Sequence, residues 1–183
     1  MRALRRYKLR SRVEVVDRSG ELGVVIGDGE VDPREERLGR RRVVVLGEWD
    51  GDGASEARDV AFGRRRMEFG VVEGKEAVGA IPLEWGIERM HGVSFDKGCY
   101  VGQELMARTH FRGMLRKLAV PITLQGVDVE KLRDPEWKNG AGTFAPQQTT
   151  IEPAQGGRRV GKLLAVAADA PIGVAILPIT QDS

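Results

Sequence analysis

The single cysteine of the sequence, Cys99, lies between two glycines, Gly98 and Gly102, just before a predicted helix. The positive end of a helix dipole favours a thiolate at such a place, and Lys97, two residues away, adds a positive charge. Because glycine has no Cβ, the flanking backbone lets a ligand approach closely. The pattern predicts a reactive or metal-binding thiol. The alternative that it leaves open is a small, buried core residue.

A metal site built from this chain alone is short of ligands. Structural zinc and iron–sulfur sites normally take about four protein ligands, whereas the chain offers one cysteine and two histidines, His91 and His110. Both histidines are expected at the surface. If Cys99 binds metal, the remaining thiolates must therefore come from another molecule. A Cys/His hydrolase requires only that nucleophile and base meet in space, but no recognised nucleophile motif surrounds Cys99.

Two other charged motifs have simpler explanations. Asp50–Gly53 is similar to the start of an EF-hand calcium loop, but the twelfth position holds Ala61 in place of glutamate, so a turn is favoured. Three consecutive arginines, Arg64–Arg66, are expected to form an exposed, solvated face, and the alternative is a surface for an anionic ligand or partner. The sequence shows no glycine-rich phosphate loop, paired-carboxylate motif or serine-based signature.

The elements that must position the thiol are predicted to be mainly short strands. β-Branched runs separated by turn residues predict antiparallel strands, with a charged loop between the second and the third run. A proline in the fourth run predicts an edge strand. The last two runs predict a hairpin. The predicted strands are Val13–Val16, Leu22–Ile26, Val43–Leu46, Leu115–Leu124 with Pro121, Val160–Ala168 and Ile172–Ile179.

Helices are predicted in three places. Ala61–Val72 reads as a short helix that ends near a glycine, and Pro82 suits the first turn of a second helix. Gly98 and Gly102 are expected to bracket a tight turn before a third helix over residues 103–112. In that third helix, Leu105 and Phe111 are expected on the buried side.

The composition excludes several classes of protein. The chain has 29 Lys or Arg and 27 Asp or Glu, a balance that does not suggest a nucleic-acid-binding face. One cysteine excludes an internal disulfide and hence a disulfide-stapled secreted scaffold. Polar residues, proline and glycine interrupt the most apolar stretch, Leu163–Ile179, so no membrane span is expected. Sparse aromatics, 5%, and 24 glycines favour a β-rich or mixed fold.

Residues 97–104, KGCYVGQE, resemble the K-G-C-Y-x-G-Q-E signature of the YgfZ/GcvT-like folate-binding family. The resemblance extends through IPLEWGIERMHGVSFDKGCYVGQELMARTHFRGMLRKLAVPI and back to RRYKLRSRVEV near the start, so it covers the chain in patches. The run GVSFDKGCYVGQELMARTHFRG is most similar to the mitochondrial branch of the family, whose members act late in [4Fe–4S] cluster assembly.

The resemblance implies an α+β fold, with a mainly antiparallel sheet and short helices, that forms the C-terminal portion of the GcvT-like folate-binding fold. Residues 1–114 are expected to be the remainder of the folate-binding module, which carries the signature. Residues 115–183 are expected to form a small β-barrel with a long insertion at 125–157. The N-terminal module of the family is expected to be missing before Met1, and a mitochondrial transit peptide is likewise expected outside this chain.

The resemblance also implies a function. Members of this branch work with A-type cluster carriers in the mitochondrial matrix to mature [4Fe–4S] proteins, and their motif cysteine corresponds to Cys99. This implies a [2Fe–2S] cluster that Cys99 shares with the carrier, with Lys97 as a second functional residue. The chain alone is expected to be a monomer, with no nucleic-acid partner.

Tetrahydrofolate is the cofactor that the family implies, although much of its pocket belongs to the missing N-terminal module. The main expectation is an assembly factor without classical turnover. The alternative is a folate-dependent aminomethyltransferase-type enzyme, a class whose catalytic acid also lies in the missing module. The residues of this chain expected to contribute to folate binding are Gly98, Tyr100, Gly102, Gln103, Glu104 and Arg108.

Overall fold

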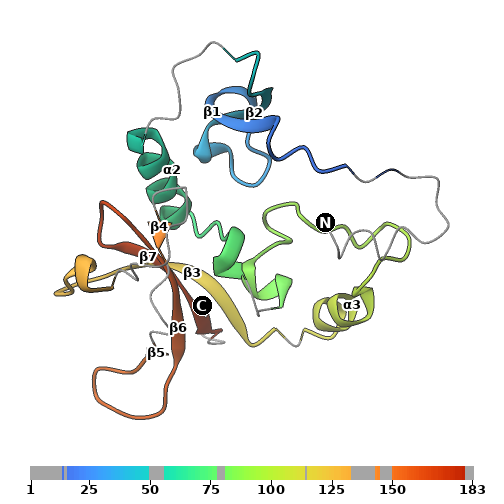
Figure 1. The fold of residues 1–183 in the computed structure, drawn as a ribbon. Helices are drawn as coiled ribbons and strands as arrows, with labels where there is room; N and C mark the ends of the chain where they lie inside the picture. The colour runs from blue at the N-terminus through green and yellow to red at the C-terminus, as the bar shows by residue number, and fades with distance from the viewer. Residues whose placement is uncertain are drawn as a thin grey trace.

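Figure 1 shows the computed structural model of the chain, which describes residues 14, 16–49, 56–77, 81–113, 115–132, 143–144 and 150–179. These residues form an α+β fold with two α-helices and two antiparallel sheets, as expected for the fold class. In chain order the elements are β1 Leu22–Val31, η1 Glu36–Leu38, β2 Arg40–Val45, α2 Glu56–Glu68, η2 Gly74–Ala77, η3 Pro82–Trp85, α3 Gln103–Phe111, β3 Lys117–Thr123, η4 Val129–Leu132, β4 Thr143–Phe144, β5 Thr150–Ile151, β6 Gly161–Ala167 and β7 Ile172–Pro178.

The first sheet is a hairpin of β1 and β2 in which Val24 pairs with Val43. Both strands extend into the charged segment that we predicted as loop, and an irregularity between Ile26 and Glu30 brings each of these residues opposite Arg41. The prediction was wrong there because a two-stranded hairpin leaves one edge of each strand in solvent, where charged side chains cost little. Both residues of the Val24–Val43 pair are exposed, at 63% and 66%.

The second sheet has the strand order β3-β7-β6-β4, with β5 also pairing with β6. It confirms the predicted hairpin, now β6 and β7, and the edge position of Pro121 in β3, which among the described strands pairs with β7 alone. Within the described residues the sheet is open, because its end strands β3 and β4 do not pair with each other. The predicted closure into a small β-barrel is therefore not found in this part of the chain.

Helix α2 lies between the two sheets (Figure 1). Its Met67 belongs to a core cluster with Ala119 of β3 and Leu164 of β6, so residues on both sides of position 114 share this core. Phe62, five residues earlier on the same helix, packs instead with Leu38 and Met90. The helix thus anchors both the hairpin and the segment after η3, from which the Cys99 loop leaves.

Of the three arginines predicted to be exposed, Arg66 is 0% exposed. Its guanidinium donates to the two carboxylate oxygens of Glu76, at 2.8 and 3.1 Å, and to the carbonyl of Val71 at 3.1 Å. The prediction of an exposed Arg66 was wrong because the burial of an arginine depends on a carboxylate partner. Here that partner is Glu76, which lies outside the run of arginines. Arg64 is partly exposed, and it pairs with Asp169 at 3.0 Å, which joins α2 to the turn between β6 and β7.

Several predictions fall outside the described residues. These are the EF-hand-like turn at residues 50–53, part of the first predicted strand, and much of the predicted insertion at 125–157. Inside that insertion the structure describes η4 and the short strands β4 and β5. In the part of the chain that is described, no helix combines the length and the apolar composition required to cross a bilayer.

Candidate site around Cys99

The Cys99 loop, residues 93–102, runs from the turns after η3 to the start of α3, which lies apart from the sheets in Figure 1. The start of this route is anchored, because Met90 is buried in the core cluster with Phe62 and the Arg89 guanidinium donates to the Phe69 carbonyl at 3.3 Å. Cys99 itself is exposed. This exposure excludes the interpretation of Cys99 as a buried core residue.

Helix α3 begins at Gln103, as predicted, and ends at Phe111. Its N-cap, Gly102, has the left-handed backbone conformation, with φ of 88°. The thiol therefore lies four residues before the first helical residue, outside the first turn.

Two hydrogen bonds join the ends of the turn that leads into α3, at Tyr100 and Gln103. The Tyr100 N–H donates to the Gln103 side-chain oxygen at 3.3 Å, and the Gln103 N–H donates to the Tyr100 carbonyl at 3.2 Å. The Lys97 ammonium lies 4.7 Å from the centroid of the Tyr100 ring, within cation–π range. The Lys97 ammonium thus contacts the face of the Tyr100 ring. The predicted site residues Lys97, Tyr100 and Gln103 therefore lie together, next in sequence to the exposed Cys99.

An aromatic cluster that sequence reasoning missed ties the start of the loop to the end of α3. The rings of Phe95 and His110 are stacked, with centroids 3.9 Å apart, and Phe111 meets both rings edge-on. His110 Nδ1 also lies 3.2 Å from a carboxylate oxygen of Glu88. The predicted surface histidine is therefore half-buried and structural. No local pattern joins residues 88, 95 and 110, so only the fold reveals this contact.

The orientation of α3 corrects a second expectation. Leu105 and Phe111, predicted on the buried side, are 51% and 73% exposed, while Met106 and Thr109 are buried. The prediction was wrong because hydrophobicity alone selected the inner face, whereas Thr109 is satisfied internally by donating its hydroxyl to the Leu105 carbonyl at 2.8 Å. The outward apolar side chains lie next to the Cys99 loop in sequence.

The residues predicted to bind folate do not form an enclosed site. Gly98, Gly102, Glu104 and Arg108 are exposed, and only Tyr100 and Gln103 among the predicted set are partly buried. A folate-sized ligand normally buries most of its surface in a concave pocket. The described residues of the signature therefore do not fit a tetrahydrofolate pocket by themselves.

A metal centre is likewise not contained in this part of the molecule. Within the described ranges, no group of three or more His, Cys, Asp or Glu side chains is arranged to hold a metal ion. Cys99 is the one thiol of the sequence. Within the described residues the arrangement offers a single exposed sulfur ligand, Cys99, and no second side chain that would complete a cluster site with it.

Comparison with known proteins gives a consistent result, although no protein-family model matches the chain. The chain is 37% identical over 138 residues to the mitochondrial iron–sulfur cluster assembly factor IBA57 homologue of Mycosarcoma maydis, an alignment that covers 66% of this chain and 34% of the relative. The IBA57 homologue of Dictyostelium discoideum is 29% identical over 160 residues, 71% of this chain and 39% of the relative. Mouse IBA57 is 57% identical over 47 residues, 26% of this chain and 13% of the relative.

The chain is close to the IBA57 branch. This confirms the resemblance to the mitochondrial iron–sulfur cluster assembly branch of the YgfZ/GcvT-like family. The chain spans about a third of the length of the relatives from Mycosarcoma maydis and Dictyostelium discoideum. The relatives are named as mitochondrial proteins, which supports the mitochondrial location that the resemblance implies.

Proposed function

We propose that this chain acts in mitochondrial iron–sulfur cluster assembly, with Cys99 as a ligand to a [2Fe–2S] cluster shared with an A-type carrier. The observation that carries the proposal is the exposed Cys99 on a fastened loop, in a chain similar to IBA57 assembly factors. Cluster irons in proteins are held by cysteine thiolates. The Cys99 thiol loses its proton to solvent and its sulfur forms a bond to iron, with no change in oxidation state.

The shortage of ligands supports a shared cluster over a resident one. One thiolate leaves three positions of a four-thiolate site to be filled by the carrier. A cluster held in this way is cargo in transit, and an exposed loop suits its transfer because the ligand can be reached without unfolding the core. We further propose that the chain acts in the mitochondrial matrix, late in the maturation of [4Fe–4S] proteins, and that its fold is GcvT-like.

Tetrahydrofolate binding and aminomethyl transfer remain predictions from the family resemblance. Among the signature residues predicted to bind folate, Gly98, Gly102, Glu104 and Arg108 are exposed, so their burial does not favour a folate pocket. Cluster sharing is therefore the function that we put to the test.

The test is visible absorbance and circular dichroism of the chain mixed anaerobically with a [2Fe–2S]-loaded A-type carrier. We expect a change in the cluster spectrum with the wild type and none with Cys99→Ser, which is nearly isosteric. A matched control carries Ser94→Cys in the Cys99→Ser background, so that the loop keeps one thiol at another exposed position. We expect no change with this control. Identical spectra for the wild type and Cys99→Ser would remove Cys99 as a ligand and lead to one-carbon transfer assays.

A further inference from the structure

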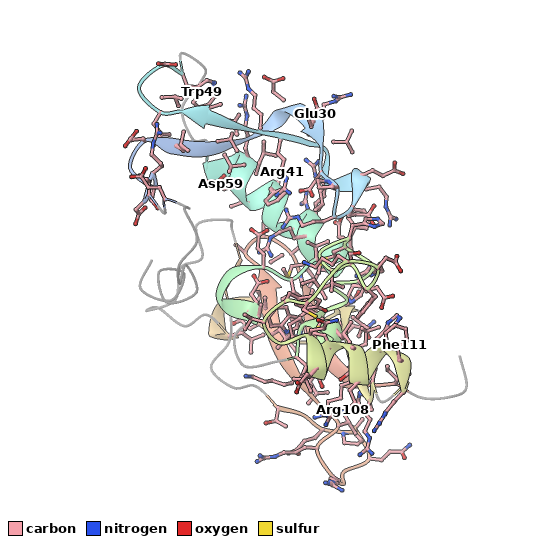
Figure 2. The ribbon with its side chains drawn as sticks, turned by 90° about the vertical axis from the view of Figure 1, so that its right-hand side faces the viewer. Glu30, Arg41, Trp49, Asp59, Arg108 and Phe111 are labelled. Carbon is pink, nitrogen blue, oxygen red and sulfur yellow. The ribbon has the colours of Figure 1, made fainter. Side chains whose placement is uncertain are left out.

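The outer side of α3 carries an apolar surface in contact with solvent. Val101 is 72% exposed, Leu105 51% and Phe111 73%. Leu105 and Phe111 are helical residues of α3, at positions about 100° and 140° around the helix from the buried Met106, and Val101 lies in the turn before the N-cap, Gly102. Figure 2 shows α3 on the side of the molecule that faces the viewer, with Arg108 and Phe111 labelled along it. Large apolar side chains grouped at the surface mark interaction sites more often than isolated ones do.

The surroundings of this apolar surface are basic. Residues 97–117 include five Lys or Arg and one acidic residue, Glu104, whereas the whole chain has a net charge of only +2. The basic residues are Lys97, Arg108, Arg112, Arg116 and Lys117. By helical spacing Arg108 falls between Leu105 and Phe111, and Arg112 is the C-cap directly after Phe111; neither arginine forms an ion pair with another described residue. Arginine and aromatic side chains are the residue types that most often dominate binding energy at protein interfaces.

We propose that this α3 outer face, consisting of Val101, Leu105, Arg108, Phe111 and Arg112, docks a cluster-carrying protein whose own surface has an apolar centre and an acidic rim. The inference rests on the proposed function and adds where the carrier binds. Charge complementarity selects the acidic rim and would speed the encounter. Because Val101 follows Cys99 by two residues, a partner seated on this face has the thiol at the border of the interface.

Glu104 favours a protein partner over an anionic membrane. It is exposed and falls by helical spacing between Arg108 and Phe111, within the face itself. A protein can meet this carboxylate with a donor, whereas anionic lipid head groups repel it. With nine residues, α3 is also short for a helix that inserts into a lipid interface.

The experiment measures equilibrium binding of the cluster-free A-type carrier to the full 183-residue chain by calorimetry. Phe111→Ser and Leu105→Ser are each expected to raise Kd about tenfold or more, as interface anchors do. The matched control is Val24→Ser with Val43→Ser, an equally exposed apolar pair on the β1–β2 hairpin, which is expected to leave Kd unchanged. Circular dichroism checks that each variant keeps its secondary structure.

Charge is tested separately. Arg108→Glu with Arg112→Glu is expected to raise Kd about tenfold and to reduce its dependence on salt, because rim charges act through screened attraction. Arg158→Glu, at an exposed arginine of the segment before β6, is the control and is expected to change little. Equal effects of the two charge changes would overturn the assignment of the face.

Failure of the docking face and failure of cluster sharing give different results. Cys99→Ser is expected to keep carrier binding while losing the spectral change, so the two properties separate. The docking proposal is overturned if the wild type does not bind the carrier, or if the Phe111 and Leu105 variants bind it as the wild type does. It is also overturned if these variants lose only binding to phosphatidylcholine–phosphatidylserine vesicles, or only self-association in sedimentation equilibrium.

Discussion

Gly102 shows how a single backbone conformation sets the place of the thiol. With φ of +88°, it turns the chain from the Cys99 loop into α3. We predict that Gly102→Ala lowers the free energy of unfolding by about 1–2 kcal/mol, because a Cβ is unfavourable in the left-handed region. Urea denaturation measures this change.

Gly98 provides the comparison. A Cβ built at Gly98 meets no atom within 4 Å, and its φ lies outside the left-handed range. Gly98→Ala is therefore expected to leave stability within about 0.5 kcal/mol of the wild type. The sequence predicted that the two glycines bracket a tight turn; of the two, Gly102 alone has a backbone conformation that favours glycine. An equal loss for the two variants would contradict the assignment of strain to Gly102.

At this scale the sequence identified the thiol and its turn but not the support around them. Cys99, Gly102 and Gln103 stand in one short signature, so their proximity could be predicted. The stack of Phe95 on His110, and the approach of Glu88 to that histidine, join residues that are up to 22 positions apart. No spacing rule connects such residues before the fold is known.

Asp32, directly after β1, connects the hairpin to the rest of the molecule. Its carboxylate, 2% exposed, accepts from the Arg34 guanidinium at 2.8 Å, and Arg34 in turn pairs with Glu73 beyond α2. Burial raises the pKa of Asp32, but hydrogen bonds from Arg34 and the charges of Arg34 and Arg41 outweigh it, so the pKa of Asp32 is lowered overall.

A lowered pKa gives a pH dependence of known sign. Ionised Asp32 stabilises the fold fully above its ordinary pKa of about 3.9, and this contribution is lost as pH falls through the lower folded value. We predict that Asp32→Asn costs about 2 kcal/mol at pH 7. The difference from the wild type should shrink below about pH 4 in unfolding curves. A difference that stays constant down to pH 2 would contradict the assigned role.

The elements divide into those that local pattern determines and those that packing determines. The hairpin β6–β7 was predicted within one residue at each end, because its apolar runs and central turn agree with its buried position. Helix α2 starts five residues before the predicted start, and the burial of Arg66 required knowledge of Glu76. The buried side of α3 was predicted wrongly because it depends on the elements that pack against the helix, and the residues of the helix alone do not specify those elements.

Across the whole molecule, stability is expected to be uneven. Strands β6 and β7 carry long runs of buried residues, such as Leu164, Val166 and Val174, whereas neither β1 nor β2 contains a buried residue. We predict that amides of β6 and β7 exchange with solvent through global opening, while those paired between β1 and β2 exchange at least about tenfold faster. Native-state hydrogen exchange followed by NMR measures both sets.

The comparison is internal, since both sheets are antiparallel and exchange in the same sample. Equal protection in the two sheets would mean that the hairpin is held as firmly as the core sheet. That result would contradict the inference that α2 holds the hairpin mainly through the small cluster around Leu38 and Phe62.

The exposed position of the sole cysteine has a practical consequence for handling the protein. Because Cys99 is the only thiol of the sequence, a disulfide between molecules of this chain must join the Cys99 residues of two copies. Air oxidation should therefore produce a covalent dimer that a reductant reverses, and it would hide the sulfur proposed to bind iron. The same property makes maleimide conjugation specific to one position, so a fluorophore or spin label can report on the loop without further mutation.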